Sequence, residues 1–231
     1  MLRLDDVRVQ LGRFALRADV TLRAGHITAL MGASGSGKST LLAVIAGFLA
    51  PASGRIHISD QEVTQMAPGD RPLSILFQDN NLFPHLTVAQ NVGLGLRPNL
   101  RLTAEQTMAR DRVLTRVGLD GMGDRLPANL SGGQQSRAAL ARALLRRRDW
   151  LLLDEPFSAL GPALRQEMLE LLRETAQAEG LSVLMVSHDP QDAQMIADQT
   201  CLLAAGAVTE PVATAELFAD PTPELRAYLG R

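Results

Sequence analysis

The sequence lacks the features that mark a secreted or membrane-spanning protein. Cys201 is the only cysteine in 231 residues, so no disulfide can form within the chain, which fits a reducing compartment. No apolar run approaches the roughly 18 consecutive residues that cross a bilayer as a helix. Residues 1–6 lack the layout of a signal peptide. We therefore expect a water-soluble chain, which other subunits would hold at a membrane if it works there.

The sequence also lacks a large excess of either charge sign. Lysine and arginine number 23 against 25 aspartate and glutamate residues, a net charge of −2, which gives no electrostatic reason to expect nucleic acid as a partner. A basic run at Arg142 and 146–148 is better explained as the solvated last turn of a helix. Cys201 lies in an apolar run, where we expect it to be buried.

The best defined motif is a P-loop with the pattern G-x-x-x-x-G-K-[ST]. Its glycines let the backbone turn tightly and bring N–H groups close to phosphate oxygens. Lys38 would bring a positive charge to the β- and γ-phosphates, and the Ser39 hydroxyl is a hard ligand suited to Mg²⁺. Residues 27–31 predict a strand before the loop and 40–46 a helix after it, so the phosphates would lie at a helix N-terminus. The predicted ATP-binding residues of the loop are Gly32, Ala33, Ser34, Gly35, Ser36, Gly37, Lys38, Ser39 and Thr40.

Residues 1–25 are predicted to form antiparallel strands, because apolar and polar residues alternate there. The apolar positions are Val7, Val9 and Leu11, then Leu16, Ala18, Val20 and Leu22. Phe14 lies just before the second stretch, in a chain with 3% aromatic residues. It could stack on the base of the nucleotide, or it could equally be a core phenylalanine beside a turn.

Three further apolar runs each end in polar residues. Residues 74–77 lead to Gln78, 150–153 to Asp154 and Glu155, and 182–187 to His188. In parallel α/β sheets, ligands gather at the carboxyl ends of the strands, so we expect these groups to converge on one phosphate chain. Asp154 would hold Mg²⁺ directly or through water, and Glu155 would orient or deprotonate the attacking water. His188 would donate to the γ-phosphate.

The stretch from 79 to 132 is the most plausible insertion, a small and mainly helical subdomain. Within it, residues 103–119 are predicted to be helical, with a capping box of Thr103 and Gln106. Its apolar stripe comprises Met108, Val113, Leu114 and Val117.

A second helix start follows the insertion, at Ser131, Gly132, Gly133 and Gln134. The apolar face of that helix comprises Ala138, Leu140, Ala141, Leu144 and Leu145. Its N-terminus is a second anion-binding end. Two such ends in one compact chain suggest a nucleotide held between two copies.

Together these motifs resemble the ATP-binding subunits of ABC transporters over essentially the whole chain. The correspondence covers Walker A (32–40), the Q-loop (Gln78), the signature (130–134), Walker B (151–154, then Glu155) and the H-loop (His188). The resemblance implies an α/β P-loop NTPase fold with a mainly parallel core sheet, an N-terminal antiparallel β subdomain and an inserted helical subdomain. Residues 1–231 would form a single ABC ATPase domain, with 1–78 and 133–231 as nucleotide-binding core and 79–132 as insertion.

The same resemblance implies the cofactors and partners. ATP and Mg²⁺ would bind, with Ser39, Gln78 and Asp154 around the metal and Glu155, His188 and Gln78 in the catalytic set. Two copies would dimerise head to tail, so that Ser131, Gly132, Gly133 and Gln134 face the partner's ATP. Hydrolysis would drive an integral-membrane permease, which receives its substrate from a periplasmic binding protein. The chain would work at the cytoplasmic face of the bacterial inner membrane, peripherally, without nucleic acid.

A narrower resemblance is to the ATPase subunits of bacterial thiamine importers. It is carried by residues 46–54, 76–83, 86–96 and 162–169. No residue in these segments indicates a binding site for thiamine or its phosphates, so that substrate is implied by analogy alone. Importers of iron, polyamines or anions remain alternatives, as does a cytosolic ABC protein acting on DNA or ribosomes. A soluble P-loop kinase would leave the signature and His188 without a role.

One residue departs from the family pattern. Gly161 stands where the family usually has Asp at the end of Ser-Ala-Leu-Asp. In the family that carboxylate helps to link one ATP site to the other, so its loss puts communication between the sites in doubt but not ATP binding.

Overall fold

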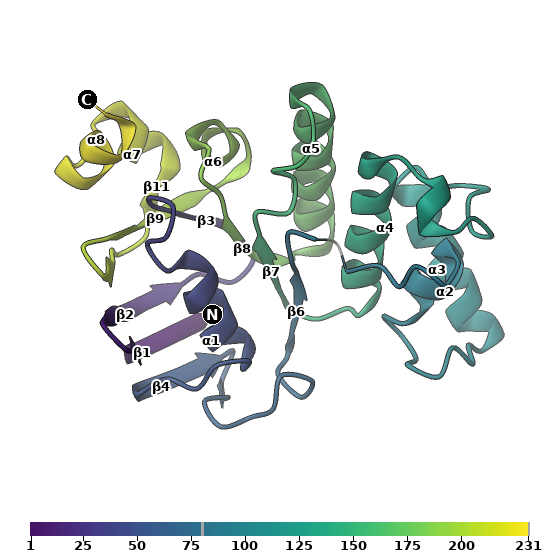
Figure 1. Ribbon diagram of the computed structural model, residues 1–231, viewed down its shortest axis with the longest axis horizontal. Coiled ribbons are helices and arrows are strands. Elements are labelled where there is room, and N and C mark those ends of the chain that lie inside the picture. Colours follow the sequence, from purple (N-terminus) through teal and green to yellow (C-terminus); the bar gives the residue numbers. More distant parts are fainter. Residues whose placement is uncertain (80, 231) are drawn as a thin grey trace.

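One mixed sheet runs through the molecule in the computed structural model, which describes residues 1–79 and 81–230 (Figure 1). The strands are β1 (Leu2–Leu11), β2 (Phe14–Leu22), β3 (Ile27–Met31), β4 (Ser53–Ile58), β5 (Gln61–Glu62), β6 (Leu73–Leu76), β7 (Trp150–Asp154), β8 (Ser182–Val186), β9 (Gln199–Ala204), β10 (Ala207–Val208) and β11 (Val212–Ala213). They are ordered β5-β4-β1-β2-β10-β9-β3-β8-β7-β6, and β11 pairs with β9. The helices are α1 (Lys38–Ala46), α2 (Val88–Gly93), α3 (Ala104–Arg116), α4 (Gly132–Leu145), α5 (Pro162–Glu179), α6 (Pro190–Ile196), α7 (Thr214–Ala219) and α8 (Pro223–Leu229), with a 3-10 turn, η1 (Pro127–Asn129).

The N-terminal part of the sheet is antiparallel, as the alternation of apolar residues predicts. β1 pairs with β2, placing Leu4 opposite Val20 and Val9 opposite Leu16, and with β4 on its other side. These four side chains are buried. Leu11 does not belong to this core, since its side chain is 46% exposed at the end of β1, beside the hairpin turn.

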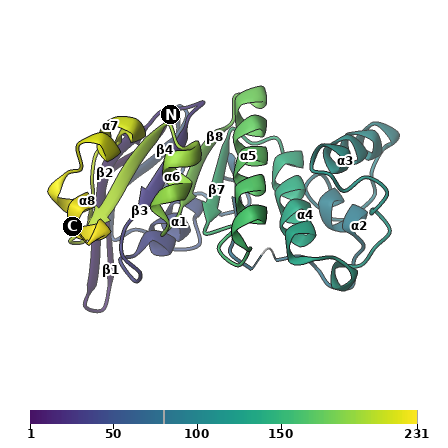
Figure 2. The same ribbon diagram turned by 90° about the horizontal axis from the view of Figure 1, so that it is seen from above.

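The other part of the sheet is parallel and comprises β6, β7, β8, β3 and β9. Alternate side chains point to opposite faces: Leu152 packs in the cluster that includes α1, and Leu151 and Leu153 pack in the cluster that includes α5. Helix α1 therefore lies between the parallel strands and the antiparallel β1, β2 and β4, whereas α4 and α5 cover the other face (Figure 2). Burial on both faces explains why the parallel strands are continuous apolar runs.

Helix α3 confirms the predicted helix but ends earlier than residue 119. Its capping box joins Thr103 and Gln106, as predicted. Val117 is the C-cap, and Gly118 follows it with a φ of 70°. The prediction that Met108 belongs to the apolar stripe facing the core is wrong, because its side chain is 54% exposed. Its position lies on the solvent side of a helix whose buried contacts come at its C-terminal end.

Helix α4 packs on both the insertion and the core. Ala138, Ala141 and Leu145 join the cluster formed with α2 and α3, and Leu140 and Leu144 join the cluster under the sheet. These residues form the predicted apolar face, and all of them are buried. Because one helix belongs to both clusters, the division of the chain at residue 132 stays a prediction.

The C-terminal helices cover β3, the strand before the P-loop, on the face opposite α1. Met31 of β3 packs with Leu202 of β9 and with Leu217 and Leu225 of α7 and α8. Cys201 is buried, as predicted, and burial raises the pKa of its thiol to about 12. Across residues 1–79 and 81–230, no helix is long and apolar enough to cross a membrane.

Candidate active site

The carboxyl ends of four neighbouring parallel strands bring most of the predicted functional residues to one side of the sheet. The order β3, β8, β7, β6 is parallel throughout, with Leu30 opposite Val186, Asp154 opposite Val186, and Leu76 opposite Leu153. The P-loop follows β3, His188 follows β8 and Glu155 follows β7. This convergence is what the parallel topology predicts.

The P-loop leads directly into α1 and leaves the helix N-terminus open. Gly37 is the N-cap residue in a left-handed conformation, and no side chain caps the first turn. Lys38 is only 5% exposed as a residue, and its ammonium donates to the carbonyls of Gly32 at 2.7 Å and Ala33 at 2.9 Å. Burial lowers the pKa of Lys38, and the nearby carboxylates of Asp154 and Glu155 partly oppose this. The lysine therefore holds the loop in shape while its charge stays beside the helix end.

A cleft of about 340 Å³ opens in front of this loop. It is lined by Leu11, Phe14, Ser34, Gly35, Gly37, Lys38, Ser39, Thr40 and Glu155. Its volume lies within the range of small-ligand sites, about 300–1,000 Å³. Three predicted loop residues lie outside the lining: Gly32 and Ala33 accept from Lys38, and the Ser36 hydroxyl is buried without a partner among the described residues.

Phe14 packs directly against the P-loop. A Cβ atom added to Gly37 would lie 2.4 Å from Phe14 Cζ, and Gly37 has a φ of 107°, so glycine is required there on both grounds. Phe14 also packs against the core cluster that contains Leu16. It thus lies at both a core and a ligand cleft, and stacking on a base stays a prediction.

Ser39, which lines the cleft, and Asp154, which is hydrogen-bonded to it, supply hard oxygen atoms. Ser39 Oγ donates to Asp154 Oδ1 at 2.9 Å. Burial raises the pKa of Asp154, opposed by the Ser39 hydrogen bond and reinforced by the neighbouring Glu155. Among the described residues, no group of three or more His, Cys, Asp or Glu side chains could hold a metal alone. A hydroxyl and a carboxylate fit Mg²⁺, which usually takes one or two carboxylates together with substrate phosphates.

Glu155 and His188 face each other across the ends of β7 and β8. His188 Nδ1 lies 2.8 Å from Glu155 Oε2, where an imidazole N–H donates to the carboxylate. Glu155 has a φ of 46°, unusual for a residue with a side chain, and its N–H donates to the carbonyl of Val186 at 3.2 Å. Backbone strain of this kind is concentrated at functional sites. In the chain alone, the His188 ring contacts the predicted base Glu155, and its contact with a γ-phosphate stays a prediction.

Two predicted elements are not part of this cleft. Gln78 is exposed and follows β6, next to the strand that carries Asp154, but it does not line the cleft. Ser131 to Gln134 start α4 elsewhere, where added Cβ atoms on Gly132 and Gly133 would approach Leu160 and Leu164. One chain therefore does not bring the signature to its own P-loop.

Several residues near the site carry no sequence signal that would have found them. Arg165 of α5 contacts Asp189, which follows His188, and Asp192 of α6. Tyr228 of α8 donates to the His188 carbonyl. Their partners are distant in sequence, so no local spacing indicates them.

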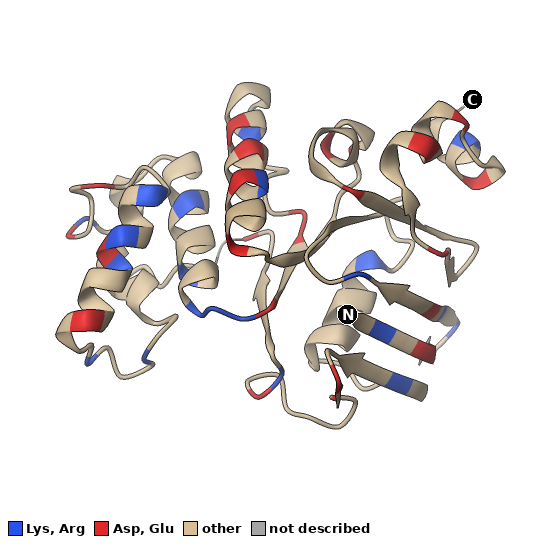
Figure 3. Ribbon diagram, turned by 180° about the vertical axis from the view of Figure 1, so that it is seen from behind, with Lys and Arg blue, Asp and Glu red and all other residues tan. Residues whose placement is uncertain are grey.

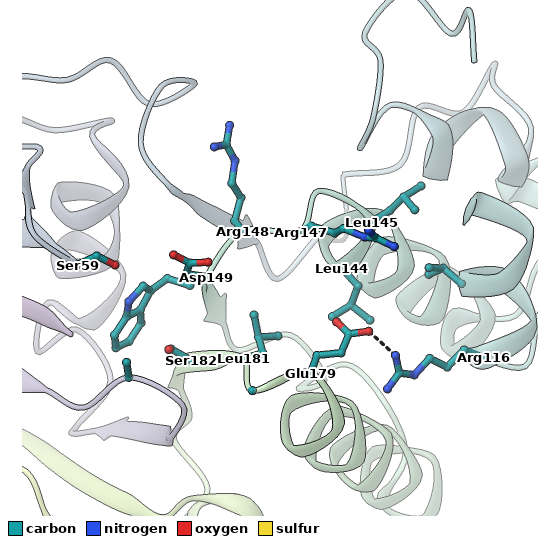
Figure 4. Close-up of a pocket in the computed structure, with 14 residues that line it drawn as sticks. Ser59, Arg116, Leu144, Leu145, Arg147, Arg148, Asp149, Glu179, Leu181 and Ser182 are labelled. Carbon is teal, nitrogen blue, oxygen red and sulfur yellow. Dashed lines mark hydrogen bonds and ion pairs between the residues drawn. The ribbon is translucent and has the colours of Figure 1, made fainter. Parts of the chain in front are cut away.

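A larger cavity, of about 570 Å³, lies at the other end of the parallel strands, where β7 and β8 begin (Figure 4). Asp149 and Ser182 line it, and the Arg116 guanidinium donates to Glu179 between α3 and α5. It contains none of the predicted site residues. The ion pair joins the insertion to the core, which is a structural role.

A P-loop at a helix N-terminus, with carboxylates at the end of an adjacent strand, defines a nucleotide-binding protein that can hydrolyse a phosphoanhydride. A family model described as "ABC transporter" matches residues 16–158. The chain therefore belongs to the ABC transporter family, as its ATP-hydrolysing component.

Relatives support the same assignment along the full length. The chain is 57% identical over 230 residues to "Thiamine import ATP-binding protein ThiQ" of Cereibacter sphaeroides, covering 100% of both chains. It is 52% identical over 230 residues to the protein of the same name from Ruegeria sp., again covering 100% of both. A solved structure, "Dimeric structure of a post-hydrolysis state of the ATP-binding cassette MJ0796 bound to ADP and Pi", is 28% identical with a TM-score of 0.79, covering 93% of this chain and 99% of that one.

Proposed function

We propose that this chain is the ATPase subunit of a bacterial importer for thiamine and its phosphates. The observation that carries the proposal is 57% identity to a thiamine import ATP-binding protein, over all of both chains. None of the residues at the cleft distinguishes one transported solute from another. The substrate is therefore selected elsewhere, by a permease and a periplasmic binding protein.

The cleft binds ATP with the phosphates along residues 34–40. The open N–H groups of α1 and the Lys38 ammonium both favour the negative charge. Phe14 stands at the side of the cleft that would receive the base. Ser39 and Asp154 would hold Mg²⁺, with Gln78 close to the same strand ends, and the ion would supply charge neutralisation at the β- and γ-phosphates.

Glu155 is the residue that orients or deprotonates the attacking water. It lines the cleft next to Asp154, and its carboxylate accepts from His188. When a γ-phosphate is present, His188 donates to it and gives up part of its contact with Glu155. This frees the carboxylate to accept a proton from water, so the pairing seen here is the resting arrangement.

The site is completed by a second copy of the chain. Ser131, Gly132, Gly133 and Gln134 lie outside their own cleft, and the structural neighbour described as dimeric held ADP and phosphate. In a head-to-tail homodimer, these residues would face the partner's γ-phosphate. Hydrolysis would then reopen the dimer.

A permease would dock beside the insertion, at the cytoplasmic face of the inner membrane. A groove there is lined by Phe83, Leu94, Arg142 and Arg146. Burial lowers the pKa of Arg142 and Arg146, and each is further lowered by a neighbouring arginine. The basic segment after α4 is blue in Figure 3. The neighbouring arginines repel one another, and a short permease helix with an acidic residue would offset that repulsion.

The test is uptake in a bacterial strain that lacks this subunit and cannot make thiamine. Such a strain should need far more external thiamine to grow, and the wild-type gene should restore uptake of labelled thiamine. The Glu155→Gln gene should not restore it, which controls for effects of the deletion on the membrane subunits. Normal thiamine uptake without the subunit would overturn the substrate assignment, and parallel assays with iron and a polyamine would then identify the alternative.

A further inference from the structure

The turn that carries His188 is held by side chains from two other elements. From α5, Arg165 Nη1 lies 3.2 Å from Asp189 Oδ2, and Nη2 donates to Asp192 Oδ2 at 2.5 Å. From α8, the Tyr228 hydroxyl donates to the His188 carbonyl. The histidine thus lies between two fixed points, neither of which lines the nucleotide cleft.

The contact of Arg165 with Asp192 is shielded from water, whereas Asp189 is more exposed, at 32%. The Arg165 side chain is 17% exposed and that of Asp192 is 10% exposed. Ser187 Oγ donates to Asp192 Oδ2 at 2.6 Å and accepts from the Asp189 N–H at 3.0 Å. A planar guanidinium that reaches two carboxylates fixes their relative direction as well as their distance. Arg165 therefore ties α5 to both carboxylates that follow His188.

Arg165 is also hydrogen-bonded to the turn that precedes α5, formed by Leu160 and Gly161 and called here the Gly161 corner. Its backbone N–H donates to the carbonyl of Gly161 at 2.9 Å, in the first turn of the helix. A displacement of Gly161 must move Arg165 with it, because a helical turn is stiff. The Gly161 corner and His188 are therefore joined by an unbroken chain of bonded groups within one copy.

We propose that Arg165 is a positioning residue that orients His188 and transmits movements of the Gly161 corner to it. The proposal rests on the catalytic role proposed for His188. Arg165 does not touch the nucleotide cleft, so its effect should fall on the rate of the chemical step and not on ATP binding. A misplacement of about 1 Å at a reacting group can cost about 10²-fold in rate.

The test compares variants of the purified full chain for ATPase kcat and KM, affinity for a non-hydrolysable ATP analogue, and Tm. Arg165→Leu should lower kcat about 10-fold and leave analogue affinity within about twofold. Arg165→Lys should be intermediate, since an ammonium keeps the charge but cannot span both carboxylates in one plane. Asp189→Asn keeps the α6 cap to the Gln191 N–H and loses the ion pair. It provides a second reading if Arg165→Leu folds poorly, and its kcat should also fall.

Arg173→Met is the matched control. Arg173 also joins α5 to α6, donating to the Met195 carbonyl at 3.3 Å, but it does not contact the turn at His188. Its kcat should match the wild type. An equal loss in Arg173→Met and Arg165→Leu would mean that general packing of α5 is responsible, which overturns the proposal.

The His188→Ala background separates this proposal from the role of His188 itself. If Arg165 acts through His188, Arg165→Leu should cause no further loss in that background. Full activity of His188→Ala would refute the role of the histidine and, with it, the positioning role. An inactive His188→Ala with a fully active Arg165→Leu would leave the histidine in place and reject only the positioning role.

Discussion

The N-termini of α1 and α4 both lie among serine and glycine residues, yet they differ in how their N–H groups are satisfied. At α1 the N-cap residue is Gly37, and no side chain accepts from the first turn. At α4 the Ser131 hydroxyl accepts from the Gln134 N–H at 3.3 Å, and the Gln134 amide accepts from the Ser131 N–H at 3.0 Å. The first end is open to a ligand, whereas the second is a stable helix start without one.

The side chains around the two helix ends also differ: those at α1 include polar and charged groups, and those at α4 are apolar. Lys38, Ser39, Asp154 and Glu155 gather at α1. At α4, the nearest groups to Gly132 and Gly133 are leucine side chains of the Gly161 corner and α5. The α1 end thus combines an open helix N-terminus with a lysine, a hydroxyl and two carboxylates, whereas the contacts of the α4 glycines are apolar. Under the proposed function, the α4 end would add N–H groups and a hydroxyl to a nucleotide held by another copy.

Glu155→Gln should give the largest effect and should test whether the α1 site contains the full hydrolytic machinery. Loss of a general base or water-orienting group commonly costs about 10²–10⁴ in rate, while ATP binding should be unchanged. With the nucleotide uncleaved, the two helix ends should remain together, so an ATP-bound dimer should accumulate on gel filtration. Turnover like that of the wild type would show that Glu155 is not the water-activating group.

Lys38→Ala tests whether the α1 end binds the phosphates at all. The γ-phosphate would lose a charged donor, so we expect affinity for a non-hydrolysable ATP analogue to fall about 100-fold in calorimetry. Lys38 also donates to Gly32 and Ala33, and Tm should be measured alongside to detect collapse of the loop. Unchanged affinity would mean that the phosphates bind elsewhere.

Ser131→Asp tests whether the α4 end faces a phosphate. Both Asp and Asn are good N-cap residues, so Ser131→Asn keeps the helix start and serves as the neutral control. The added negative charge should lower the ATPase rate of the dimer about 10-fold through repulsion, and the neutral variant should change it little. ATP analogue binding to the isolated chain should be the same in both. Equal rates would place the signature away from the nucleotide.

The two helix ends also show what could be predicted from the sequence. The P-loop, the α4 cap and the residues that end β7 and β8 were predictable, because each is contiguous with a buried strand or an amphipathic helix. The pairing of Glu155 with His188 and the bridge from Arg165 to Asp192 were not, because their partners lie on elements that only the sheet order brings together. The prediction that Met108 is buried was wrong because periodicity alone does not show how far along a helix the contacts extend.

Gly161→Asp is expected to have the smallest effect, and it addresses how the two ends communicate. Gly161 has φ −64° and ψ 158°, and a Cβ added there meets nothing within 4 Å, so aspartate fits without strain. The helix has no side-chain cap, and aspartate in place of glycine should contribute a few tenths of a kcal/mol, about a one-degree rise in Tm.

Measurements of Tm and of cooperativity for ATP distinguish the two interpretations of Gly161, a helix cap or a weakened link between the ATP sites. If Gly161 is merely a cap, Gly161→Asp changes Tm slightly and leaves ATPase kinetics alone. If the missing carboxylate weakens communication between the α1 site of one copy and that of the other, restoring it should raise the Hill coefficient for ATP in the assembled transporter. Because Arg165 bonds to the backbone of residue 161, which the substitution retains, any change in cooperativity must come from the new carboxylate. A Hill coefficient and maximal rate that both stay at wild-type values would make the glycine functionally silent.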